Sequence, residues 1–552
     1  MEVRSGEGIR VVDHIVDHLA AHGVRHIFGV DGANIEDLYD AAYFRDDITA
    51  VLTKHEFSAA AMADGYRRSG GPIAVVAATS GGGCLNTLAG LGESLASRVP
   101  VLALIGQAPT PLDGHGSFQD TSGDNGALDA VALFSAVSRY CRRIRTAQEI
   151  LTALPEALAE AERGGPAVLL LPKNIQQTAI EDAHWTDGKR RRPVCSDVTA
   201  VAEALLSTTG PVTIIAGEQV GADDARLELM RLGTALRARV VTVPDAKDVA
   251  ESPIGVSGVM GHPSVVTAVA QSAVCLLLGT RMSVTARAGL DGVLTTVPTL
   301  SIGSAPPYLP CAHVHSENLR ASLSALFEAV RRSRRAVPAP LPRRELQPPP
   351  AEGPGVRYRA AMRIMDEAIP DGCDIVVDAG NIGASAIHYL PARRDGRFLV
   401  ALGMGGMGYS FGAGIGVSFH RGRRTVVIAG DGAFFMHGME IHTALQYRLP
   451  ITFCLFDNHA HAMCVTREQQ FYGDRYSYNR FGPSRLGAGL AAMFPGLTAL
   501  DVSDVDQLPA ALRVALDHDG PAVVAVDCSP DEIPPFAAFL TTKEDSHVAA
   551  RT

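Results

Sequence analysis

The chain has few of the features that mark several protein classes. Its nine cysteines are scattered without Cys-x-x-Cys spacing, so the sequence indicates neither a zinc site nor a disulfide framework. Its 49 basic residues are outnumbered by 59 acidic ones, and the net charge of −10 argues against a nucleic-acid partner. No apolar run approaches transmembrane length, and the first residues lack the apolar segment of a signal peptide. We therefore expect no membrane partner and a cytoplasmic protein.

The 552 residues, 47% of them hydrophobic, are enough for several cores. Two linkers divide the chain: a basic run that ends at Pro193, and the arginine- and proline-rich residues 331–355. We interpret their charges as a solvated connector rather than anion sites. In the middle part, strand-like runs at 211–217, 238–243 and 272–279 alternate with helical stretches. The sequence predicts three doubly wound α/β domains with mainly parallel sheets, at residues 1–185, 193–332 and 356–552.

The most informative pattern is Gly430-Asp431-Gly432, because Asn458 follows it at the end of the next strand-like run. Residues 424–429 and 451–456 are apolar and rich in β-branched side chains, as buried strands are, and apolar residues recur at helical spacing over 433–447. Asp431 and Asn458 are thus expected at the carboxyl ends of two strands joined by a helix. Open α/β sheets bind their ligands at that edge.

The residue types at this edge suit a phosphate group and a hard cation. Gly430 and Gly432 let the backbone approach a phosphate closely, and a helix that begins near Ala433 offers its free N–H groups. Asp431 and Asn458 carry oxygen ligands suited to Mg²⁺ or Ca²⁺. A tight turn would explain Gly-Asp-Gly alone, but Asn458 one crossover later favours a metal site.

This pattern resembles that of the thiamine diphosphate-dependent enzymes. The resemblance implies a pyrimidine-binding, a central and a diphosphate-binding domain, in that order, and an enzyme with thiamine diphosphate and Mg²⁺ as cofactors. It implies a homodimer or homotetramer with active sites between subunits. It assigns the metal to Asp431, Asn458 and Ala460. It also assigns cofactor contacts to Gly430, Asp431, Gly432, Ala433, Asn458, His461, Ala462 and Met463.

Enzymes of this kind need a glutamate, distant in sequence, that acts on the aminopyrimidine ring of the cofactor. Glu56 precedes an alanine-rich helical segment that ends in Gly65-Tyr66, and this stretch resembles the acetohydroxyacid synthase branch of the family. Segments 23–30, 79–86, 100–107 and 117–120 resemble that branch as well. The resemblance makes Glu56 catalytic, whereas the alternative is an ordinary acid in the first turn of a helix. It adds Gly29, Val30, Ser80 and Asn86 to the cofactor contacts.

A second glycine pattern, residues 403–408, fits the G-x-G-x-x-G of a dinucleotide-binding turn and follows a strand-like run. The pattern is a weak signal in a chain with 55 glycines. It also resembles the turn in which the family places a methionine against the bent cofactor. We therefore assign Gly405 and Met407 to cofactor binding. The alternative is that Met407 is a methionine of the hydrophobic core and does not contact the cofactor.

The substrate is less well specified. Phe118 and Gln119 match the Phe-Gln of the acetohydroxyacid synthase active site, and His115 lies where related decarboxylases keep a catalytic histidine. Arg467 stands where that branch has a tryptophan, and Asp457 replaces the first asparagine of its pair. Segments 260–262 and 279–281 resemble parts of an FAD site, but residues 300–306 lack the expected acid, so the sequence leaves FAD open.

The sequence predicts a carboligase. It would decarboxylate a 2-oxo acid donor, with pyruvate expected, and transfer the resulting acyl carbanion to a keto or aldehyde acceptor. One alternative is a non-ligating decarboxylase that releases an aldehyde. A remote alternative is a non-catalytic regulatory subunit with the same fold.

Overall fold

The computed structural model describes residues 8–180 and 196–540, which form two compact units. One unit contains the N-terminal part together with residues 401–422 and 433–451, and the other contains the middle part and the rest of the C-terminal part. The basic linker that ends at Pro193 lies outside the described residues.

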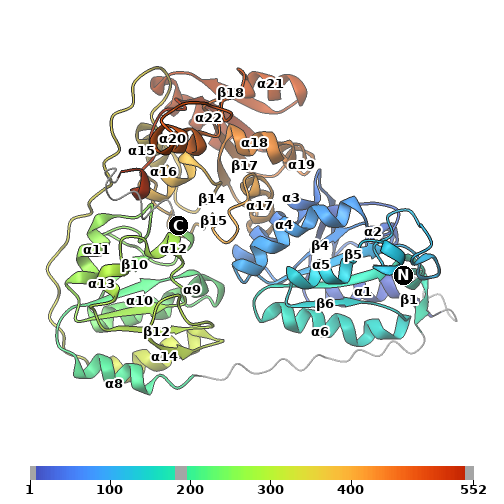
Figure 1. Ribbon diagram of the computed structural model, residues 1–552, viewed down its shortest axis with the longest axis horizontal. Coiled ribbons are helices and arrows are strands. Elements are labelled where there is room, and N and C mark those ends of the chain that lie inside the picture. The colour runs from blue at the N-terminus through green and yellow to red at the C-terminus, as the bar shows by residue number, and fades with distance from the viewer. Residues whose placement is uncertain (1–7, 181–195, 541–552) are drawn as a thin grey trace. The chain divides into compact units, whose positions relative to one another are not determined.

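The first unit is built on a six-stranded parallel sheet in the order β3-β2-β4-β5-β7-β6, drawn in blue and cyan in Figure 1. The strands are β2 (His26–Val30), β3 (Thr49–Leu52), β4 (Ala74–Ala78), β5 (Val101–Gln107), β6 (Tyr140–Arg143) and β7 (Pro166–Pro172). The helices of this part are α1 (Val11–Ala21), α2 (Glu36–Tyr43), α3 (Glu56–Arg68), α4 (Gly82–Ala96), α5 (Ala130–Ala136), α6 (Ile150–Glu162) and α7 (Lys173–Gln177). Strands β4, β5 and β7 are continuous buried runs, as parallel strands covered on both faces are.

Glycines bring α17 (Tyr409–Arg421) unusually close to α3 in this unit. A Cβ atom on Gly416 would lie 2.0 Å from the carbonyl oxygen of Met62, and one on Gly412 would lie 2.5 Å from that of Ser58. Gly65 faces the backbone of Ala413 in the same way, at 2.4 Å. No larger side chain fits at these positions, so the glycines fix the spacing between the two helices.

The middle domain has a five-stranded parallel sheet in the order β10-β9-β11-β12-β13. Its strands are β9 (Val212–Ala216), β10 (Arg239–Thr242), β11 (Val274–Leu278), β12 (Thr299–Gly303) and β13 (Ala312–His315). Its main helices are α8 (Thr199–Ser207), α9 (Glu218–Ala222), α10 (Arg226–Leu236), α11 (Pro263–Ala270), α12 (Val284–Arg287), α13 (Asp291–Leu294) and α14 (Leu319–Val330). Helix α14 packs against both α8 and α10 beside the sheet (Figure 1).

The C-terminal sheet, in the order β15-β14-β16-β17-β19-β18, repeats the topology of the first sheet. In both, the second strand along the chain lies outside the first, and the last two exchange places. Its strands are β14 (Asp374–Val377), β15 (Phe398–Val400), β16 (Thr425–Gly430), β17 (Ile451–Asp457), β18 (Thr498–Val502) and β19 (Ala522–Asp527). Further helices of the C-terminal part are α15 (Tyr358–Ala368), α16 (Asn381–Tyr389), α18 (Asp431–His437), α19 (Ile441–Gln446), α20 (Ala462–Phe471), α21 (Leu486–Met493) and α22 (Leu508–Asp517). The predicted fold class is confirmed.

Buried polar contacts join the middle and C-terminal domains within the second unit. The ammonium of Lys247 donates to backbone carbonyls at the end of α16, those of Ala386 at 3.1 Å and Ile387 at 2.5 Å. Arg397 pairs with Asp248 across the same boundary.

The segment between these two domains, residues 331–355, contains no helix or strand, as predicted. Its charges are not all solvated, however. The buried Arg335 donates to the backbone carbonyls of Leu205 and Gly210, so this part of the interpretation was wrong.

The helix predicted over 433–447 is interrupted. Helix α18 ends at His437, a 3₁₀ turn follows over Gly438–Glu440, and α19 begins at Ile441. A Cβ on Gly438 would lie 2.1 Å from the ring of Phe434, so the chain turns tightly there. Met436 and Met439, two of the apolar residues at helical spacing in this segment, are 48% and 42% exposed.

No helix within the described residues is long and apolar enough to cross a membrane.

Candidate active site

Glu56 lies at the start of α3 in the first unit and is only 8% exposed. Its Oε2 atom accepts a hydrogen bond of 2.9 Å from the side-chain amide of Asn86 on α4. Its Oε1 atom lies beside Gly83, where a Cβ would be 3.1 Å away. Asn86, predicted as a cofactor contact, is therefore placed where it orients the Glu56 carboxyl group.

A second glutamate holds the segment that leads into Glu56. The side chain of Glu440 accepts hydrogen bonds from the backbone N–H groups of Lys54 at 2.7 Å and His55 at 3.0 Å, and from the Thr443 hydroxyl at 2.8 Å. Burial raises the pKa of Glu440, although these donors oppose the shift. Glu440 was not among the predicted residues. Glu440 lies 386 positions from Lys54 and 385 from His55, so no local pattern could reveal these contacts.

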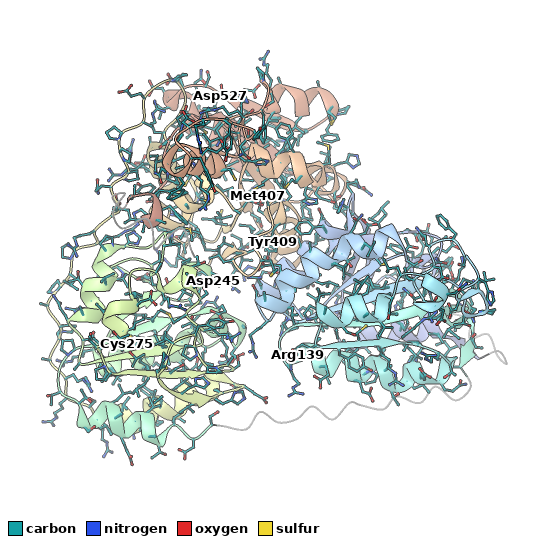
Figure 2. The ribbon with its side chains drawn as sticks, in the orientation of Figure 1. Arg139, Asp245, Cys275, Met407, Tyr409 and Asp527 are labelled. Carbon is teal, nitrogen blue, oxygen red and sulfur yellow. The ribbon has the colours of Figure 1, made fainter. Side chains whose placement is uncertain are left out.

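The glycine turn at 403–408 is held by a carboxylate of the protein. Glu93 on α4 accepts from the backbone N–H groups of Gly403, Met404 and Gly405 at 3.2, 2.6 and 3.3 Å. A dinucleotide phosphate would need the same backbone N–H groups. Because Glu93 already accepts from them, the geometry argues against a dinucleotide-binding turn here. The half-buried Met407 follows, just before α17 (Figure 2). Gly405 has a positive φ of 66° and is exposed.

The predicted substrate residues lie in a loop after β5. Gln119 is half-buried, has a positive φ of 59°, and its side-chain oxygen lies 3.4 Å from the Thr79 hydroxyl. Phe118 is 77% exposed, and His115 is exposed as well. Ser80 is fully buried and accepts a 2.7 Å hydrogen bond from Asn34. The structure thus brings Gln119 and Ser80 to the end of β4, while Phe118 and His115 extend outward.

Gly29 and Val30 end strand β2. A Cβ on Gly29 would lie 2.1 Å from the carbonyl oxygen of Ala77 and 2.4 Å from the Tyr39 hydroxyl. The need for glycine at this position therefore comes from packing inside the domain. Val30 is half-buried at the carboxyl end of β2.

The predicted metal ligands come together in the second unit, at the ends of β16 and β17. The backbone N–H of Ala460 donates both to Asp431 Oδ2, at 3.1 Å, and to Asn458 Oδ1, at 3.0 Å. The two side-chain oxygens therefore converge on one point. The Asn458 amide also donates to the Tyr358 hydroxyl at 3.2 Å, which holds its oxygen toward Asp431.

The Asp431 carboxyl group is buried, and the negative charge of Asp457 lies next to it. Burial, with this charge adding to it, raises the pKa of Asp431 to about 7. A cation would neutralise this pair. The chemistry of the donor set, two carboxylates and an amide oxygen, fits a divalent ion.

The residues after Asn458 form the start of α20. His461 precedes this helix, and its Nδ1 atom would lie 2.6 Å from a Cβ on Gly432, so glycine is needed there to admit the imidazole ring. A Cβ on Gly430 would meet only the carbonyl oxygen of Phe456, at 3.9 Å, so packing does not require glycine there. Ala462 is buried and Met463 half-buried in the first turn, and no side chain caps this helix. Ala433 is buried in α18.

Three family models match the chain in order. They are the N-terminal TPP binding domain of thiamine pyrophosphate enzymes over residues 9–128, the central domain over 198–300, and the C-terminal TPP binding domain over 378–526. Together they cover more than half of the chain. The chain belongs to the thiamine pyrophosphate enzymes.

Curated relatives cover nearly the whole of this thiamine pyrophosphate enzyme. A probable acetolactate synthase large subunit of Methanocaldococcus jannaschii is 27% identical, with 95% of this chain and 92% of the relative aligned. The large subunit of acetolactate synthase isozyme 2 of Escherichia coli K12 is also 27% identical, over 93% of this chain and 94% of its own. The chloroplastic acetolactate synthase 1 of Nicotiana tabacum is 26% identical, with 93% of this chain and 81% of the relative aligned. The predicted family is confirmed.

The segments that suggested FAD have partners within the protein. His262 is buried, stacks on His388 at 4.2 Å and accepts from the Arg343 guanidinium at 2.8 Å. Arg281 lies over the ring of Tyr308, 4.1 Å from its centre. These side chains therefore also have structural roles in the fold of this thiamine pyrophosphate enzyme.

Proposed function

We propose that this protein is a thiamine diphosphate- and Mg²⁺-dependent carboligase similar to acetolactate synthase. It decarboxylates a 2-oxo acid, with pyruvate as the expected donor, and joins the remaining fragment to a keto or aldehyde acceptor. The observation that carries the proposal is the pair of half-sites, Glu56 with Asn86 and Asp431 with Asn458, in two domains of one topology. When bound, the cofactor supplies the electron sink that decarboxylation requires.

The diphosphate end of the cofactor is assigned to the second half-site. Asp431, Asn458 and the Ala460 carbonyl would hold Mg²⁺, which prefers oxygen ligands. The uncapped first turn of α20, a helix of 10 residues, directs the N–H groups of Ala462 and Met463 toward a diphosphate.

The pyrimidine end is assigned to Glu56. Because Asn86 donates to Oε2, the other oxygen, Oε1, which lies beside Gly83, is the one left to contact the cofactor. The Glu56 side chain is 8% exposed, so little water reaches it. We propose Glu56 as the acid–base group, Met407 as the side chain against the cofactor, and Gln119 as a substrate contact.

Two copies of the chain would complete the site, as a homodimer or a homotetramer. The unit that contains Glu56 exposes large apolar side chains, an arrangement typical of surfaces that a partner covers. They include Phe118 at 77%, Met404 at 66%, Phe435 at 53%, Met436 at 48% and Met439 at 42% exposure.

The proposal is tested with full-length protein stripped of cofactor and given back thiamine diphosphate and Mg²⁺. Pyruvate is added with one candidate acceptor at a time, and products are resolved by NMR. Acetolactate or another ligated product supports the carboligase. Acetaldehyde alone would establish the non-ligating decarboxylase instead. Bound cofactor with every 2-oxo acid untouched would contradict both and favour a non-catalytic subunit.

A further inference from the structure

A cavity of about 270 Å³ is lined by both the connector that leads into the C-terminal domain and that domain itself. The connector contributes the proline-rich segment 346–351, and the domain contributes the start of α15, part of α16 and the stretch around Ile533. Gln347, Pro349 and Pro350 are exposed at this cavity, so a small molecule can reach it from solvent. None of the residues assigned above to the metal or the cofactor lines it.

Glu532 supplies a carboxyl group to this cavity, and only one of its oxygens is used within the protein. Glu532 is 9% exposed, and its Oε1 atom accepts from the backbone N–H of Tyr358 at 2.9 Å. Its Oε2 atom is buried and has no hydrogen-bond partner among the described residues. Burial raises the pKa of Glu532 to about 7, because the Tyr358 N–H and the charge of Arg357 compensate only in part. A buried oxygen of this kind calls for a donor from outside the protein.

Arg357 supplies the opposite charge to the same cavity. Its Nη2 atom donates to the backbone carbonyl of Gly353, whereas its Nη1 atom is buried and has no acceptor in the part of the chain that the structure describes. A guanidinium N–H group without an acceptor is suited to a carboxylate. The cavity therefore combines an acceptor for a cationic group with a donor for an anionic one, beside the apolar side chains of Leu346 and Ile533.

We propose that this cavity binds a small zwitterion, a molecule with an ammonium and a carboxylate group on an aliphatic body. The ammonium donates to Glu532 Oε2, the carboxylate accepts from Arg357 Nη1, and the apolar lining contacts the aliphatic part. The cavity has room for about ten non-hydrogen atoms. The competing explanation is a water-filled void at the end of the connector, in which Glu532 serves only to hold the first N–H group of α15.

A ligand at Glu532 would act on the diphosphate half-site through Tyr358. The Tyr358 N–H donates to Glu532, and the Tyr358 hydroxyl accepts from the Asn458 amide at 3.2 Å. An ammonium at Oε2 keeps Glu532 ionised, which strengthens the bond from Tyr358 and fixes the ring that orients Asn458. Ligand binding should therefore raise the affinity for thiamine diphosphate with Mg²⁺. This coupling rests on the proposed function, whereas binding at the cavity does not.

The test uses the full-length chain without cofactor and three related probes, followed by isothermal titration calorimetry. L-Norvaline carries both charged groups, n-butylamine only the ammonium and pentanoate only the carboxylate. The variants are Glu532→Gln, Arg357→Gln and Ala351→Leu, which narrows the cavity without removing a charge. Arg363→Gln and Glu367→Gln are the matched controls, because these two residues form an exposed ion pair on α15.

We expect L-norvaline to bind wild type with a Kd of about 1 mM or lower, and the two other probes to bind at least about 10-fold more weakly. Glu532→Gln and Arg357→Gln should each weaken L-norvaline binding about 10- to 100-fold, and the controls should not change it. Ala351→Leu should abolish binding, and it serves alone where a charge variant does not fold. Wild type that does not bind L-norvaline, or binding that survives in Ala351→Leu, would overturn the inference.

The coupling is measured in the same way. Saturating L-norvaline should tighten the binding of thiamine diphosphate with Mg²⁺ about 5-fold, and the cofactor should tighten L-norvaline by the same factor, since coupling is reciprocal. Tyr358→Phe should remove this effect while L-norvaline still binds. Equal cofactor affinity with and without L-norvaline would overturn the link through Tyr358. Cofactor that fails to bind while L-norvaline binds would contradict the proposed function and support the cavity assignment.

Discussion

Removing the charge of Glu93 should loosen the turn that carries Met407. Glu93 is 3% exposed, and its carboxylate accepts from three consecutive backbone N–H groups at 403–405, from Ser97 at 2.7 Å and from Arg68 at 3.0 Å. Burial alone works to raise the pKa of Glu93, but Arg68 and the hydrogen-bond donors outweigh it, so the pKa lies below its ordinary value. The group is therefore a buried carboxylate that depends on its donors.

The size of the effect follows from those contacts. A hydrogen bond to a charged group contributes about 1.5–3 kcal/mol, and breaking a buried ion pair costs about 3–5 kcal/mol. In Glu93→Gln one acceptor oxygen becomes an amide that faces other donors. Arg68 keeps Asp64, at 2.6 Å, as its remaining partner. We expect local destabilisation of the turn by about 3 kcal/mol, since such contributions are not additive.

Hydrogen–deuterium exchange measures this directly, because the amides of 403–405 are the donors. A loss of about 3 kcal/mol predicts roughly 100-fold faster exchange at these amides. The control is Glu162→Gln, which removes an exposed glutamate paired with Arg67 and should leave these amides unchanged. Equal protection of the turn in wild type and Glu93→Gln would refute the reasoning.

Two further predictions concern stability. Gly416→Ala forces a Cβ to 2.0 Å from the Met62 carbonyl and should cost at least about 1–3 kcal/mol in thermal unfolding, whereas Gly489→Ala in α21, with no atom within 4 Å, should not lower Tm. Burial raises the pKa of Glu532 to about 7, so the folded protein keeps a proton that the unfolded chain releases near pH 4.3. This contribution to stability, up to about 3.5 kcal/mol, is fully present below about pH 4.3 and is lost as the pH rises to about 7. Glu532→Gln should therefore flatten the fall in Tm over this pH range, and an unchanged slope would contradict the prediction.

The sequence was sufficient to predict the sheets because buried parallel strands are continuous apolar runs between turns. Runs 424–429 and 451–456 became β16 and β17 almost residue for residue. The same approach failed at 433–447. The spacing of apolar residues does not show whether a helix face packs inside the chain or stays exposed. Met436 and Met439 lie on an exposed part of the segment. It also could not predict the break at Gly438, which depends on the Phe434 ring.

The candidate site was predictable where its residues lie in short motifs. Asp431 and Asn458 follow strands, and their position in the sequence was enough to expect them close together. The backbone N–H of Ala460 links them, a contact that the sequence did not predict. The supporting residues were missed. Glu93 is 310 positions from Gly403, and Tyr358 is 100 from Asn458, so these pairs leave no trace in local spacing. Only the folded topology brings them together.

The central claim is that Glu56 is the acid–base group of a thiamine diphosphate enzyme. The measurement that tests it is the rate of pyruvate consumption by wild type and Glu56→Gln at saturating thiamine diphosphate and Mg²⁺, with cofactor affinity determined for both by calorimetry. We predict a loss of turnover of about 100- to 10,000-fold in Glu56→Gln, with cofactor still bound. Full turnover by Glu56→Gln with bound cofactor would contradict the account.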